Sequence, residues 1–144
     1  MKILVMNGPS LNLLGTREPG IYGTATMDEC LKELRQLYPQ DEILYFQSNT
    51  EGVLIDRLQE AAREGVEGVA LNAGAYTHTS IALLDALRAV GIPAVEVHLS
   101  NVHDREDFRH RSMIAPACIG VVAGFGIDSY RLAVEALRHH RNTN

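Results

Sequence analysis

Polar side chains follow four apolar, strand-like runs of the chain, at the point where each run ends. Asn7 closes the first run, Gln47 follows the second, Asn72 closes the third, and His98 and Ser100 follow the fourth. Amides, imidazoles and hydroxyls of this kind bind oxygen-rich molecules and move protons. Because the carboxyl ends of parallel strands meet at one edge of an open sheet, we expect an active site for a small polar molecule there.

Glu96 and His98 lie two residues apart in the fourth run, so in a strand both side chains point to the same face. A carboxylate inside a central parallel strand is costly to bury unless it has a partner. The imidazole is the obvious partner, and the carboxylate would orient and charge it. The pair indicates a histidine acid assisted by glutamate, and a buried structural ion pair is the alternative.

A second candidate segment runs from Asn72 to Ser80. Its small residues permit close approach of a ligand, and its hydroxyls precede a predicted helix, whose N-terminus favours anions. For the hydroxyls, ordinary helix capping is the better explanation. Asn72 and His78 have no such simple structural role, so they are candidate binding residues.

The segment from about 8 to 25 is rich in Gly and Pro, which predicts a loop, and its length is typical of lids and binding loops. It carries Asn12, Arg17 and Tyr22. A guanidinium at about 4 Å could lower the pKa of a phenol, ordinarily ~10, by roughly three units, although desolvation of the tyrosinate opposes this. Arg17 could therefore make Tyr22 usable as a base. A solvated loop charge and a packed aromatic are the alternatives.

Arg109 lies in a charged run that follows the loop after the fourth strand. Charge runs usually form solvated faces, and we expect this for Arg105, Glu106 and Asp107. Arg109 could instead reach back and bind hydroxyls or a carboxylate through two parallel hydrogen bonds.

Helical patterns separate the apolar runs, and this alternation predicts an α/β fold with a parallel sheet. With 144 residues and no linker or repeat, we expect one domain over residues 1–144. Its predicted architecture is a flavodoxin-like, doubly wound, five-stranded parallel sheet, and a classical Rossmann half is the second choice. The predicted strands cover residues 2–7, 42–47, 67–72, 93–98 and 118–122. One predicted helix begins at the capping box of Thr26, and a second contains the apolar residues that recur at helical spacing over 54–62. A third begins after the capping residues at 77–80, and the last begins at Phe125.

Composition excludes several classes of function. A net charge of −5 with scattered basic residues argues against nucleic-acid binding. No apolar run approaches the ~20 residues of a membrane span or the pattern of a signal peptide, so no membrane partner and a cytoplasmic location are expected. Neither a glycine-rich nucleotide loop nor a convincing metal-ligand spacing is present, so we expect no cofactor and no metal. Lys2 and Lys32 lie away from the predicted edge, which disfavours an imine mechanism.

Five segments, spread over nearly the whole chain, form a distinctive set of motifs. They are N-G-P-S-L-N-L-L-G-T-R-E-P-G-I-Y-G (7–23), Q-S-N-T-E-G (47–52), N-A-G-A-Y-T-H-T-S (72–80), V-H-L-S-N (97–101) and R-E-D-F-R-H-R-S (105–112). In this order they resemble the motifs of a known family, type II 3-dehydroquinate dehydratase. The resemblance implies a flavodoxin-like subunit that removes water from 3-dehydroquinate by anti elimination. The reaction would pass through an enolate to 3-dehydroshikimate, in the shikimate or quinate pathway.

By position, the resemblance implies that Tyr22 is the base that takes the C2 proton and that Arg17 is its activator on a mobile lid. It implies that His98, oriented by Glu96, protonates the leaving C1 hydroxyl, and that Asn12 holds a water that stabilises the enolate. Backbone amides at 99–100 would take the substrate carboxylate. The implied substrate-binding residues are Asn72, His78, Asp85, Leu99, Ser100 and Arg109.

The resemblance also implies a homododecamer built from trimers, in which Asp85 reaches the site of a neighbouring subunit. Four residues depart from those that the family often has, and none is at an implied catalytic position. These four residues are Thr50, Val53, Arg111 and Met113.

The alternative function is a non-catalytic flavodoxin-like module that binds a nucleotide or another small ligand.

Overall fold

The computed structural model describes residues 1–16, 18–22 and 24–144, with the side chains of Pro19 and Tyr22 excepted. Within these residues, five parallel strands form one sheet in the order β2-β1-β3-β4-β5. This is the flavodoxin-like order, so the predicted fold class is confirmed. The strands are β1 (Lys2–Asn7), β2 (Glu42–Gln47), β3 (Gly68–Asn72), β4 (Ala94–His98) and β5 (Gly120–Ala123).

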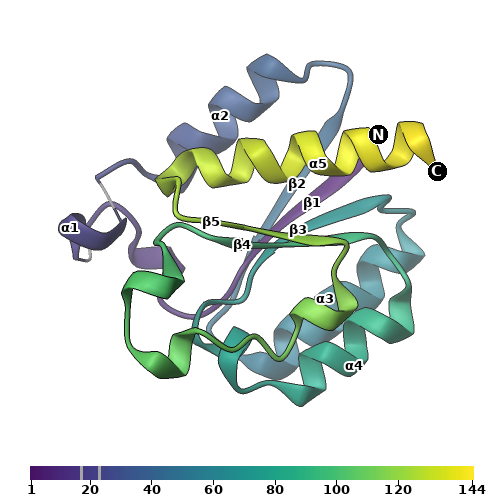
Figure 1. Cartoon of the computed structure of the whole chain (residues 1–144). Coiled ribbons are helices and arrows are strands. Elements are labelled where there is room, and N and C mark those ends of the chain that lie inside the picture. The colour runs from purple at the N-terminus through teal and green to yellow at the C-terminus, as the bar shows by residue number, and fades with distance from the viewer. Residues whose placement is uncertain (17, 23) are drawn as a thin grey trace.

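Helices cover both faces of the sheet (Figure 1). Two of them share a core cluster on one face and two share a cluster on the other, which gives three layers. No helix in the described part of the chain is long and apolar enough to cross a membrane. The covering helices are α2 (Met27–Leu37) and α5 (Ser129–Thr143) on the first face, and α3 (Glu51–Arg63) and α4 (Ile81–Val90) on the second.

The central strand β1 is buried on both sides. Ile3 and Val5 belong to the cluster with α2 and α5, whereas Leu4 and Met6 belong to the cluster with α3 and α4. Successive strand side chains point to opposite faces, so a strand between two helical layers needs an unbroken apolar run. The first polar side chain after this run, Asn7, marks the carboxyl edge of the sheet.

The sequence signals at the ends of α2 and α4 are confirmed. Thr26 and Glu29 form a capping box, with each side chain accepting a hydrogen bond from the other's backbone N–H. Ser80 caps α4 by accepting from the backbone N–H of Leu83 at 2.9 Å, and Gly91 ends that helix in the left-handed conformation.

The segment at 8–25, predicted as a loop, contains short helical turns. It contains a 3-10 turn at Leu11–Leu13 and the short helix α1 (Pro19–Tyr22). Short turns of this length leave no periodic apolar pattern, so the sequence shows only their Gly and Pro residues. In Figure 1, α1 lies at the end of the sheet opposite to the two chain termini.

The last two elements begin later than predicted. Cys118 lies before β5, because Pro116 forms a 3-10 turn at Ala115–Ala117 that Cys118 closes. Likewise, α5 begins at Ser129 rather than at Phe125, because a 3-10 turn precedes it.

The backbone just after β1 lies too close to the backbone at the end of β3 for a side chain to fit between them. The backbone N–H of Gly8 donates to the Asn72 carbonyl oxygen at 2.7 Å. A Cβ at Gly8 would lie 2.4 Å from the Ala73 carbonyl oxygen, so the contact requires glycine. The loop after β1 is therefore held against the loop after β3.

Gly8→Ala should lower the free energy of unfolding by about 1–3 kcal/mol, because the added methyl overlaps a backbone carbonyl. Gly52→Ala is a matched control in the first turn of α3, where an added Cβ meets nothing within 4 Å. It should be neutral or stabilise by up to about 1 kcal/mol. Urea unfolding of both variants measures the difference, and equal stabilities would contradict the close contact.

Candidate active site

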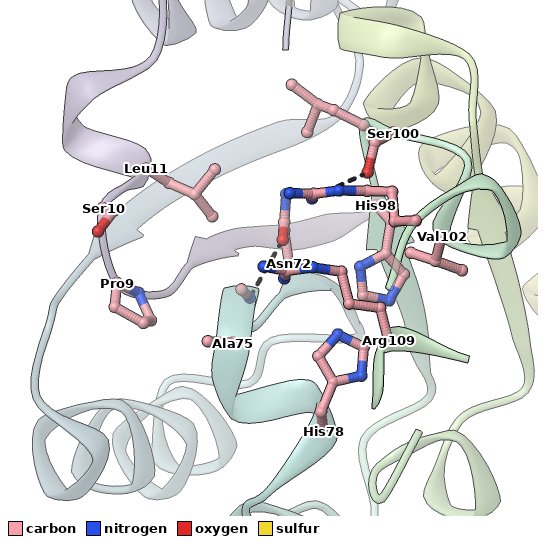
Figure 2. Close-up of a pocket in the computed structure, with 13 residues that line it drawn as sticks. Pro9, Ser10, Leu11, Asn72, Ala75, His78, His98, Ser100, Val102 and Arg109 are labelled. Atoms are coloured by element: carbon pink, nitrogen blue, oxygen red, sulfur yellow. Dashed lines mark hydrogen bonds between the residues drawn. The ribbon is translucent and has the colours of Figure 1, made fainter. Parts of the chain in front are cut away.

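A cleft lies at the carboxyl edge of the sheet, between the loop after β1 and the ends of β3 and β4. In Figure 2, the loop residues lie on one side of the cleft and His78, His98 and Arg109 lie on the other, with Asn72 between them. The cleft therefore brings together most of the predicted residues whose side chains are described. Its lining is Pro9, Ser10, Leu11, Asn72, Gly74, Ala75, His78, His98, Leu99, Ser100, Val102, Arg105 and Arg109.

His98 and Glu96 form the predicted pair in β4. His98 Nε2 lies 2.7 Å from Glu96 Oε2, and the two residues are 7% and 2% exposed. A buried carboxylate needs hydrogen bonds at both oxygens. The second oxygen, Oε1, accepts from the Ser112 hydroxyl, which in turn accepts from the backbone N–H of Ala115 at 3.0 Å.

This pairing determines what His98 can do chemically. Nε2 donates to Glu96, so Nδ1 is the nitrogen that can exchange a proton with a molecule in the cleft. Because Glu96 fixes the plane of the ring, the exchangeable proton has a defined direction. The pair can thus act as an oriented general acid or base.

His78 is held by a main-chain contact. Its Nδ1 donates to the Arg111 carbonyl oxygen at 2.7 Å, which leaves Nε2 as the second polar atom of the ring. The His78 and His98 rings are nearly parallel, with an interplanar angle of 18° and centroids 6.1 Å apart. Since the contact uses the backbone of Arg111, it does not depend on the side chain at that position.

Arg109 lines the cleft as predicted, and its Nε donates to Glu106 Oε2 at 2.7 Å. This hydrogen bond lowers the pKa of Glu106 below its ordinary value. The prediction that Arg105 belongs to a solvated face was wrong. Arg105 is half-buried and lines the cleft, and its Nη1 lies 3.5 Å from Ser100 Oγ, whereas Glu106 and Asp107 are exposed as expected.

Asn12 and Asp85 lie outside the cleft. Asn12 is exposed and lines a neighbouring hollow with Tyr45 and Gln47, and Asp85 is exposed on α4. Arg17 falls outside the described residues, as does the side chain of Tyr22. The predicted roles of these four residues therefore stay predictions.

The thiols are poor candidates for nucleophiles. Burial raises the pKa of both Cys30 and Cys118 to about 12, so both stay protonated at neutral pH. Among the residues with described side chains, no group of three or more His, Cys, Asp or Glu is placed to hold a metal ion. The polar side chains that line the cleft are two imidazoles, two guanidinium groups, one amide and two hydroxyls.

Comparisons with known proteins agree with this geometry. The chain matches the model of a family described as Dehydroquinase class II over residues 1–138. It is 57% identical over 136 residues to a 3-dehydroquinate dehydratase of Chlorobaculum tepidum, covering 94% of this chain and 92% of that protein. It is 58% identical over 139 residues to one of Carboxydothermus hydrogenoformans, covering 95% and 90%. A type II dehydroquinase structure from Butyrivibrio crossotus superposes with a TM-score of 0.93 at 45% identity, covering 96% and 97%.

Ser112→Ala should lower the free energy of unfolding by about 1–3 kcal/mol, because it leaves a buried Glu96 oxygen without a donor. Ser112→Thr keeps the hydroxyl and should retain most of the stability. Urea unfolding of the two variants separates the effect of losing the hydroxyl from other effects of a substitution at residue 112. Equal stability of Ser112→Ala and the wild type would show that the hydroxyl does not support the carboxylate.

Proposed function

Because the chain belongs to the class II dehydroquinase family, we propose that it is a hydro-lyase that dehydrates 3-dehydroquinate to 3-dehydroshikimate, in the shikimate or quinate pathway. The observation that carries the proposal is the buried His98–Glu96 pair, whose histidine lines the cleft. Elimination of water requires a proton for the departing hydroxyl, and an oriented imidazole can supply it.

The proposed reaction is an anti elimination in two steps. Tyr22, as a phenolate favoured by Arg17, takes the C2 proton, and the electron pair moves onto the carbonyl to form an enolate. Asn12 holds a water that stabilises this enolate. The enolate then collapses, the C1–O bond breaks, and His98 gives its proton to the hydroxyl, which leaves as water.

Substrate binding is assigned to the other side chains of the cleft. Arg109 already uses Nε for Glu106, so its terminal nitrogens would meet substrate oxygens. His78 and Asn72 also line the cleft and present polar groups to it. The backbone amides of Leu99 and Ser100, at the end of β4, would take the carboxylate.

The lysine positions support the enolate route over an imine. Lys2 Nζ donates to the Glu64 carbonyl oxygen at 3.0 Å, at the opposite end of β1 from Asn7. Lys32 is exposed on α2. Neither amine is close to the cleft, so a carbonyl held there would meet no lysine nucleophile.

We further propose that the active form is a homo-oligomer, with trimers assembled into a dodecamer. Asp85 is exposed on α4, as a residue that reaches the active site of a neighbouring subunit must be. In the described sheet β5 is an edge strand, and Ile119 and Val121 are 44% and 50% exposed, so a partner subunit would cover apolar surface there. The proposal includes a cytoplasmic location, one catalytic domain over 1–144 and a lid at about 8–25.

The discriminating experiment adds 3-dehydroquinate to the purified protein and follows ultraviolet absorbance. A rise from the conjugated enone of 3-dehydroshikimate, in a protein without flavin absorbance, supports the proposal. Bound flavin or nucleotide with no turnover would favour the non-catalytic binding module. Borohydride added during turnover should leave the enzyme active, whereas a covalent adduct on a lysine would overturn the enolate mechanism.

Tyr22→Phe should fold normally and lose about 10²–10⁴-fold in kcat, because it removes a positioned base. Tyr38→Phe is the control, since the Tyr38 hydroxyl bonds Glu135 away from the cleft. Steady-state kinetics compare the two variants. A near-normal kcat for Tyr22→Phe would disprove its assignment as the base.

Arg109→Ala should raise KM by about 10- to 100-fold, because it removes charge-assisted hydrogen bonds to the substrate. Arg131→Ala is a matched control: Arg131 Nε also bonds a carboxylate three residues earlier at 2.7 Å, but on the surface of α5. Calorimetric titration with 3-dehydroshikimate gives an independent measure. Unchanged affinity for Arg109→Ala would remove the residue from the binding site.

A further inference from the structure

A chain of buried polar side chains lies behind the cleft. Tyr130, near the start of α5, is fully buried, and its hydroxyl contacts the amides of Asn7 and Asn72. Those two asparagines are neighbours in the register of β1 and β3, and both are buried. Of the three, only Asn72 lines the cleft, so Tyr130 and Asn7 do not contact a molecule bound there.

One backbone donor determines the direction of every hydrogen bond among these connected side chains. The Gly74 N–H can only donate, and it does so to Asn72 Oδ1 at 3.2 Å. Asn72 therefore turns its Nδ2 toward Tyr130 Oη, at 3.1 Å, and Tyr130 accepts. The single hydrogen of the Tyr130 hydroxyl then goes to Asn7 Oδ1 at 2.7 Å, and Asn7 Nδ2 donates onward to Tyr45 Oη at 3.4 Å.

We propose, on the basis of the function proposed above, that Tyr130 is a positioning residue that holds Asn72 with its amide nitrogen as a donor toward the substrate. Nδ2 has two hydrogens, and the bond to Tyr130 uses one of them. The second can reach an acceptor oxygen in the cleft, such as a hydroxyl or carboxylate oxygen. An Asn72 rotated by half a turn would present Oδ1 instead and would repel those same lone pairs.

The environment of Tyr130 keeps this arrangement constant. Burial raises the pKa of its hydroxyl far above the ordinary value for tyrosine, so the hydrogen is retained throughout the working pH range. With that hydrogen committed to Asn7, the oxygen has only acceptor capacity left for Asn72. Asn72 is thus held by an acceptor on one side and by the Gly74 donor on the other.

Kinetics of 3-dehydroquinate turnover test the proposal. Tyr130→Phe should raise KM about tenfold, the ratio that corresponds to about 1.4 kcal/mol, and should change kcat less. Tyr38→Phe is the matched control, because it removes a tyrosine hydroxyl that donates to Glu135, a residue of α5 like Tyr130. The KM of this control should equal that of the wild type. Thermal unfolding of each variant sets an assay temperature at which all are folded.

A double-mutant comparison separates positioning from a general structural role. In Asn72→Ala there is no amide to position, so adding Tyr130→Phe should change KM less than twofold. A merely structural role of Tyr130 would give the same factor in both backgrounds and would overturn the proposal. A KM for Tyr130→Phe within twofold of the wild type would also overturn it.

Asn7→Ala is the second variant, and it decides the matter if Tyr130→Phe does not fold. It leaves Tyr130 in place but frees its hydroxyl hydrogen, which then competes with the Asn72 donor. KM should rise here as well, and an unchanged KM would overturn the proposal. An inactive wild-type protein would overturn the proposed function itself, whereas an active wild type with unaffected variants would overturn only the role of Tyr130.

Discussion

One close backbone contact, between the ends of β1 and β3, holds the carboxyl edge of the sheet together. Gly8 donates to the Asn72 carbonyl oxygen, and a side chain at Gly8 would strike the backbone at Ala73. Because the strands are parallel and paired residue by residue, this contact keeps Asn7 beside Asn72. It also keeps the loop after β1 in place as one wall of the cleft, opposite the side chains that β4 supplies.

The second constraint is that polar groups at this edge are buried and must be satisfied within the protein. Glu96 is 2% exposed, and it has an imidazole on one oxygen and a hydroxyl on the other. A carboxylate without these partners would be unfavourable inside a sheet. The irregular segment that carries Ser112 is therefore part of the support of His98, although it lies 16 residues after Glu96 in the chain.

How much the sequence could predict depended on whether the signal was local. Four of the five strands, the caps at Thr26 and Ser80 and the Glu96–His98 pair follow from spacing within a few residues and were predicted to within one residue, whereas β5 and α5 begin later than predicted. The roles of Arg105 and Ser112 depend on the path of an irregular segment, which has no periodicity to read. Tyr130 was not predicted at all, because its polar contacts come from strands far away in the sequence and leave no local signal.

The order of the chain has a consequence for how the molecule is made. Asn7 leaves the ribosome well before its hydrogen-bond partner Tyr130, which is synthesised 123 residues later. Strand β1 can pair with β2 and β3 early, since both precede α5 in the chain. Until α5 docks, water must satisfy the asparagine amides at the edge, so the rear support of the cleft is complete only once α5 is in place.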